Sequence, residues 1–210
     1  MPNLNTMAES LPAHIDESKI PPYPDNLEGM KLESTTEAPP FKSNGSHSTS
    51  FAHLKDQHST SKTLNARKGA FEFGHMMEDV VGSYVIVPLK NYSASSGYTN
   101  HTNFNFWNGR GDIAFHISFR RQDRTIRFNS ASGGHWGKES YINFPSNLKA
   151  EKNIDLKVNY ISPGRYWVDI GDSQWDIHVD PRTAPDSLTY RSDSNAMFGQ
   201  NVDATNYYMA

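Results

Sequence analysis

The 210-residue chain contains no cysteine, which excludes a disulfide framework, a thiolate metal site and a cysteine nucleophile. It also lacks an apolar run of the roughly eighteen residues that a membrane-spanning helix needs. The formal net charge of −3 and the pI near 6.3 give no bulk attraction to nucleic acid or to an acidic membrane surface. The N-terminal segment shows neither the basic start nor the apolar run of a secretory signal. We therefore expect no nucleic-acid partner, no membrane insertion and a cytoplasmic location, with export by a non-classical route left open.

Aromatic residues are scarce in the first part of the chain, where residues 1–66 contain only Tyr23, Phe41 and Phe51. The same segment holds seven of the twelve prolines and a Ser/Thr-rich patch. Such a composition cannot bury enough apolar surface to offset the entropy that ordering removes. We predict a disordered Pro/Ser/Thr-rich tail over residues 1–66 and a folded domain over residues 67–210. Residues 51–70, which cross this boundary, form at most a short helix.

From Gly69 onward, short apolar segments alternate with Gly, Asn, Ser and Pro. Nine of these segments have the length and composition of strands, and none shows the period of a helix. They comprise residues 71–74, 83–89, 103–108, 112–120, 124–130, 140–144, 154–160, 165–171 and 174–180. Many short strands separated by turns predict an all-β fold, a sandwich or barrel of antiparallel strands.

The most informative alternation lies in residues 112–120, because every second side chain of a strand shares a face. One face carries the apolar residues Ile113, Phe115, Ile117 and Phe119. The other face carries the polar residues His116, Ser118 and Arg120. A strand with these two faces packs one side against a core and leaves the other side for polar contacts.

The next strand supplies a matching polar face. The segment RQDR predicts a tight turn centred on residues 122 and 123, and this turn sets the register. Ser118 then lies opposite Arg127, and His116 lies opposite Asn129, so that polar residues meet polar ones. Trp136 and Glu139 follow after a glycine-rich loop.

These residues do not resemble a catalytic set. A glycosidase commonly needs two carboxylates at the bond that it cleaves, and here Glu139 is the one that is well placed. A Gly-x-Ser-x-Gly elbow is absent from the sequence, and His116 with Glu139 offers too few ligands for a metal ion. Arginine, histidine and asparagine side chains suit hydroxyl groups, and an exposed indole stacks on the C–H face of a sugar ring. We predict a non-catalytic surface for neutral polyols that uses no cofactor and no metal.

The segments DIAFHISFR, IRFNS and GGHWGKE resemble the sugar-binding signature of the galectins. The resemblance continues through residues 142–160 and 164–182 and covers about residues 70–205. It implies a jelly-roll sandwich of two antiparallel sheets and a lectin for β-galactosides or related galactose-containing glycans. Compact lectins of this family also occur in fungi.

The resemblance also implies a role for each matching residue. His116 and Arg120 would bind the axial hydroxyl and the ring-oxygen region of a galactose-type sugar. Asn129 and Glu139 would bind its outer hydroxyls. Trp136 would stack beneath the apolar face of the sugar, and the neighbouring glycines would leave the indole open to it.

Three features depart from the family pattern. Ser118 stands where the family has a longer asparagine, and Tyr141 stands where it has an arginine. The turn after Arg120 is shorter than is usual in the family, which makes recognition of one sugar more secure than recognition of two. Arg127 lies on the same face and can partly replace the missing charge. The predicted site therefore consists of His116, Ser118, Arg120, Arg127, Asn129, Trp136, Glu139 and Tyr141.

Two other functions stay open at this stage. A galectin-related protein-interaction module with a lost or altered sugar site would account for Ser118 and Tyr141. A glycan-active enzyme of similar architecture would need a second carboxylate at the site, for which the sequence gives no candidate. The oligomeric state is also open, and a homo-oligomer would supply the linked sites by which weak lectins gain avidity.

Overall fold

The computed structural model describes residues 57–79, 83–90, 101–148, 153–192 and 196–209. These residues form thirteen strands and no helix. A helix able to cross a membrane is accordingly not found among them. The strands pair antiparallel throughout the two sheets, which confirms the predicted all-β class.

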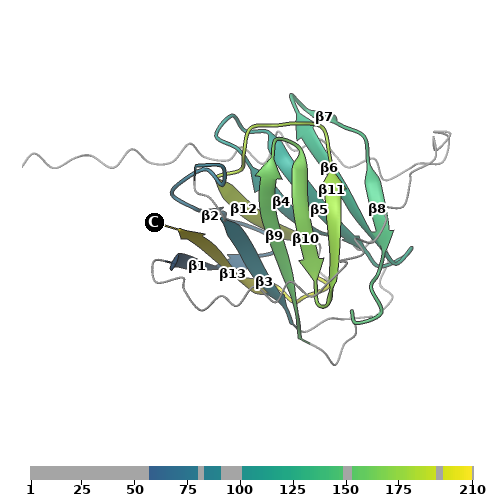
Figure 1. Cartoon of the computed structure of the whole chain (residues 1–210). Helices are drawn as coiled ribbons and strands as arrows, with labels where there is room; N and C mark the ends of the chain where they lie inside the picture. Colours follow the sequence, from purple (N-terminus) through teal and green to yellow (C-terminus); the bar gives the residue numbers. More distant parts are fainter. Residues whose placement is uncertain (1–56, 80–82, 91–100, 149–152, 193–195, 210) are drawn as a thin grey trace, which may run out of the picture.

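Two sheets lie face to face and form a sandwich (Figure 1). The six-stranded sheet has the spatial order β1 (Gln57–Asn65), β13 (Asn201–Met209), β3 (Tyr84–Leu89), β9 (Ile154–Ser162), β10 (Arg165–Ile170) and β11 (Ser173–His178). The seven-stranded sheet has the order β2 (Phe71–Glu72), β12 (Ser187–Ser192), β4 (His101–Trp107), β5 (Ile113–Arg120), β6 (Thr125–Ser132) and β7 (His135–Trp136), and β8 (Ser140–Asn143) also pairs with β6. All nine predicted strand segments are confirmed at least in part.

Aromatic side chains fill the space between the two sheets. Phe115 of β5 stacks on Tyr166 of β10 with 4.1 Å between ring centroids, and it also stacks on Phe128 of β6 at 5.9 Å. Phe119 of β5 meets Phe198 edge to face at 4.9 Å. All of these rings are buried. Because the inward aromatic side chains of β5 are tightly packed in the core, the backbone that carries its outward side chains is held rigidly.

The predicted tail boundary at residue 66 is wrong, because residues 57–65 form strand β1. This strand pairs with β13 from Gln57 opposite Met209 to Asn65 opposite Asn201. Leu64 is buried in the core, whereas residues 58–63 are exposed. Backbone hydrogen bonds to β13, rather than buried side chains, hold most of this strand in the sheet. Its sequence can therefore be polar. The expected short helix is likewise wrong for residues 57–70, and residues 1–56 lie outside the described residues.

Three further strands were not predicted from the sequence. β7 is only two residues long, and β12 alternates polar and apolar residues but carries only two apolar side chains, Leu188 and Tyr190. β13 turns Val202, Ala204 and Asn206 inward, and only the first of these is a strong strand-forming residue. The sequences of these three strands give only weak strand signals, and each strand is held in its sheet by pairing with a neighbouring strand.

We predict that Leu64→Ala lowers the free energy of unfolding by about 2–5 kcal/mol, the usual range for emptying a buried leucine site. Thr60→Ala, on the exposed part of the same strand, should change it by less than about 0.5 kcal/mol. Urea denaturation of the full chain measures both values. Equal and negligible effects would mean that β1 does not belong to the folded domain.

Candidate functional site

Strands β5 and β6 form the hairpin that the sequence predicts. His116 lies opposite Asn129, and Ser118 lies opposite Arg127. The connection is a four-residue turn over residues 121–124, between Arg120 and Thr125, which are themselves paired. The predicted register is confirmed, and it places the polar residues of both strands on the face that points away from the core.

The predicted place of Ile113 on the core face is wrong. Three residue steps of β5, from Ile113 to His116, span two steps of β6, from Ala131 to Asn129. This β-bulge moves Ile113 to the polar side of the sheet. There it packs with Trp107 and Ala131 in a small cluster that is separate from the main core, and Trp136 packs against this cluster.

The glycines beside Trp136 have a conformational role. Gly133 and Gly134 connect β6 to β7 with φ of 56° and 82°, and two successive positive φ angles are typical of a tight hairpin turn. The turn folds Trp136 back against Ala131, its partner in the ladder. The indole is half-buried, and its ring centroid lies 4.8 Å from that of His116. Trp136 therefore borders the polar face with one side supported by apolar residues.

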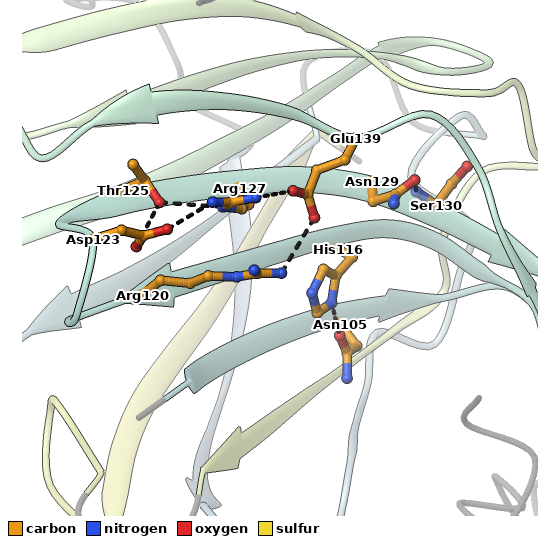
Figure 2. Close-up of polar contacts among 9 residues, drawn as sticks. All are labelled: Asn105, His116, Arg120, Asp123, Thr125, Arg127, Asn129, Ser130 and Glu139. Carbon is orange, nitrogen blue, oxygen red and sulfur yellow. Dashed lines mark hydrogen bonds and ion pairs between the residues drawn. The ribbon is translucent and has the colours of Figure 1, made fainter. Parts of the chain in front are cut away.

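His116 is held neutral and in one tautomer. Its Nδ1 lies 2.5 Å from Oδ1 of Asn105 on β4 (Figure 2). An amide oxygen can only accept, so Nδ1 donates and the neutral ring keeps Nε2 as an acceptor. Burial lowers the pKa of His116 to about 3, and the positive charge of Arg120 and the proximity of His101 act in the same direction. The imidazole thus presents an acceptor, which suits a hydroxyl donor.

A carboxylate between two guanidinium groups forms the other half of the face (Figure 2). Glu139 accepts through Oε2 from Nη2 of Arg120 at 3.2 Å, and through Oε1 from Nη1 of Arg127 in a short contact. Asp123, in the β5–β6 turn, accepts from Nη2 of Arg127 at 2.6 Å. Thr125 donates to Asp123 at 2.9 Å and accepts from Nε of Arg127 at 3.3 Å. The network fixes these side chains, so a ligand meets donors and acceptors that are already oriented.

Arg127 and Tyr141 lie opposite each other on β6 and β8. The guanidinium carbon of Arg127 lies 5.9 Å from the ring centroid of Tyr141. Burial alone would lower the pKa of Arg127, but its hydrogen bonds to Glu139 and Asp123 outweigh burial and raise that pKa. Arg127 is thus permanently positive and pairs with Glu139, and it lies next to Tyr141 on the neighbouring strand.

Ser118 occupies the centre of this face but lies beneath its surface. Its side chain is fully buried, and its Oγ makes no hydrogen bond to the described residues. Its partners in the ladder are Asn103 on β4 and Arg127 on β6. The short side chain therefore offers a ligand less reach than the neighbouring histidine and arginine.

The structure brings all eight predicted residues to one face of the seven-stranded sheet, on β5, β6, β7, β8 and the loop before β8. Three residues that were not predicted also lie at this face: Asn105, Asp123 and Asp180, whose carboxylate lies next to Gly137. Asn105 occupies the polar phase of β4, and Asp123 lies in the predicted turn. These two could have been found from the strand alternation and the turn, whereas Asp180 gives no local signal.

Residues 88–181, which include every predicted site residue, match the family model described as galactoside-binding lectin. Residues 88–181 belong to the galectin family. This segment is thus a galectin-type carbohydrate-binding domain, and the family assignment drawn from the sequence motif is confirmed.

Several solved galectins are also similar to the chain. A galectin of Caenorhabditis elegans has 16% identity and a TM-score of 0.47, over 75% of this chain and 97% of its own. Sheep galectin-11, solved with glycerol, has 17% identity and a TM-score of 0.43, over 73% and 98%. A Xenopus laevis galectin has 13% identity and a TM-score of 0.47, over 71% and 100%. No curated protein sequence matches the chain significantly.

We predict that His116 makes the galectin domain less stable in acid. Its pKa falls from 6.5 when unfolded to about 3 when folded, so the unfolded state binds the proton first. Stability is therefore complete above about pH 6.5 and declines as the pH falls toward 3. His116→Gln cannot titrate and should lack this part of the decline. Urea denaturation of both proteins across this pH range measures the difference, and a folded-state imidazole pKa near 6.5 by NMR would contradict the prediction.

Gly137 follows Trp136 and has no room for a side chain. A Cβ at this position would lie 2.2 Å from Oδ2 and 2.8 Å from Cγ of Asp180. The obstacle is the end of a side chain and not the backbone, so removing that side chain should make space.

We therefore predict that Gly137→Ala destabilises the domain, because Asp180 must leave its place. The double variant Gly137→Ala/Asp180→Ala should recover most of the melting temperature that the single variant loses. Thermal denaturation of the two variants and of Asp180→Ala provides the comparison. If the double variant is no more stable than Gly137→Ala, the contact with Asp180 is not the cause.

Proposed function

We propose that this galectin domain is a non-catalytic lectin that recognises β-galactosides or related galactose-containing glycans through its polar strand face, with Trp136 stacking on the sugar. The observation that carries the proposal is the placement of His116, Arg120, Asn129, Trp136 and Glu139 on one face of the seven-stranded sheet. No single one of these residues would indicate a glycan, but together they offer complementary contacts to one sugar ring.

The chemistry of the face supports a neutral polyol. His116 offers an acceptor and Arg120 offers donors, while Glu139 has both carboxylate oxygens engaged and retains further lone pairs for hydroxyl groups. A hydroxyl group both donates and accepts, so it can bridge such neighbours. The opposite charges on Arg120, Arg127, Glu139 and Asp123 are paired with each other, which favours a ligand without net charge.

The departures from the family pattern adjust the proposed affinity. Each hydrogen bond to the ligand that Ser118 or Tyr141 fails to make costs about 0.5–1.5 kcal/mol. Losing two such bonds would weaken binding by roughly ten- to hundredfold. Arg127 offsets part of this loss, since it pairs with Glu139 and supplies a positive charge that Tyr141 lacks. We therefore propose a weak site in which recognition of one galactose-type unit is more secure than recognition of a second sugar.

A second candidate is a galectin-related protein-interaction module. It is favoured by two large side chains on the six-stranded sheet, Ile161 of β9 and Trp167 of β10, which are each 37% exposed. An exposed tryptophan on the sheet opposite the sugar face is a candidate contact for a protein partner. In that case the polar face would retain its fold without binding a glycan.

Calorimetric titration of the full chain with lactose, and with sucrose as the control sugar, distinguishes the two candidates. We expect saturable binding of lactose alone. Trp136→Ala should abolish it, because the stacking surface is lost, whereas Trp167→Ala, which removes the exposed indole of the other sheet, should leave it unchanged.

The decisive comparison is between these two tryptophan variants, after circular dichroism has shown that both are folded. Lactose binding that survives Trp136→Ala would place the sugar elsewhere. Absence of lactose binding by the unaltered protein would favour the interaction module or a different glycan, which a broad glycan array would then resolve.

A further inference from the structure

A carboxylate from the far end of the chain borders the proposed sugar face. A Cβ built on Gly137 would lie 2.2 Å from Oδ2 of Asp180 and 3.3 Å from Oδ1 of Asn129. Both oxygens are therefore close to one point, next to the residue that follows Trp136. Asp180 belongs to the connection from β11 in one sheet to β12 in the other. Its side chain is half-buried, so part of it faces solvent at the edge of the site.

The backbone of this connection is fixed on both sides. The Asp180 carbonyl accepts a hydrogen bond from Oγ of Ser130 at 3.1 Å, and Val179 donates to the carbonyl of Gly164 at 2.8 Å. Gly164 has a φ of +77°, and a Cβ there would lie 2.5 Å from the carbonyl oxygen of Val179. Only glycine allows this close approach, so the fold fixes the backbone from which the Asp180 side chain extends toward Gly137.

The charge of Asp180 is not neutralised by an ion pair. The salt bridges among the described residues involve Arg120, Arg127, Arg165 and His178, and none of them includes Asp180. The nearby Arg182 donates instead to the carbonyl of Pro181, at 2.9 Å. Asp180 therefore contributes a negative charge at the side of the face where Asn129 lies.

Asn129 itself is oriented by its neighbour. Its Oδ1 accepts from the backbone N–H of Ser130 at 2.8 Å, so the amide NH₂ is the end that is able to donate to a ligand. A hydroxyl group that accepts from this NH₂ can also donate to a nearby carboxylate. A sulfate or carboxylate group in the same place would instead meet the negative charge of Asp180.

We propose that Asp180 determines the specificity of the site: it admits glycans with a free hydroxyl beside Asn129 and disfavours those with an anionic substituent there. This inference rests on the proposed function of the face as a glycan site. It narrows the ligand class to glycans that are uncharged at this edge.

The test compares the full-length protein with Asp180→Asn, which keeps the shape of the side chain and removes its charge. Asp172→Asn is the matched control, because it changes the net charge equally at an exposed turn before β11, whereas Asp180 follows that strand. The probes are lactose and a set of lactoses with one sulfate on each galactose hydroxyl in turn, titrated by calorimetry at low and high salt.

We expect Asp180→Asn to raise the affinity for at least one sulfated isomer by roughly tenfold relative to lactose, an effect that salt reduces. Asp172→Asn should leave every ratio unchanged. Unchanged ratios for all isomers in Asp180→Asn, with lactose still bound, would overturn this inference alone. Absence of lactose binding by the unaltered protein would overturn the proposed β-galactoside site, and with it the role of Asp180.

Discussion

The register between β5 and β6 is the constraint on which both the core and the candidate site depend. With His116 opposite Asn129, the aromatic residues of the two strands enter the sandwich and the polar ones leave it. A slip of one residue would exchange the two faces of β6, burying Arg127 and exposing Phe128. The energy that fixes the register therefore comes from the core, through contacts such as Phe115 on Tyr166. The site inherits its geometry from packing on the opposite side of the same strand.

The polar face illustrates how such a scaffold can hold charged groups in a fixed arrangement. Glu139 would be expensive to bury alone, but Arg120 and Arg127 compensate its charge from two strands. His116 avoids the same cost by staying neutral, and its Nδ1–H donates a hydrogen bond to Oδ1 of Asn105. Two different solutions thus lie side by side, one ionic and one neutral. Their common result is a set of donors and acceptors that are held in place on one face.

Features encoded by neighbouring residues were predictable from the sequence, and features that depend on distant segments were not. Alternation and a short turn are visible in the sequence of the β5–β6 hairpin, so its register is predictable from residues 112–130 alone. The same holds for the shared face of its five predicted residues, His116, Ser118, Arg120, Arg127 and Asn129. The bulge at Ile113 places this side chain against Trp107 and Ala131 of the neighbouring strands, and the sequence of β5 alone does not predict it. Strand β1 is specified by β13, at the other end of the chain, while its own composition resembles that of a tail.

Asp180 shows the same limit at the level of a single side chain. It is separated from Ser130 by fifty positions in the sequence, yet the hydrogen bond between them ties the crossing connection to β6. The connection must pass this end of the sandwich because β11 and β12 belong to different sheets. Its close approach is possible because Gly164 and Gly137 carry no side chains at the two contact points. A requirement of topology, met by two glycines, thus brings a charged side chain to the edge of a surface whose other residues come from β4 to β8.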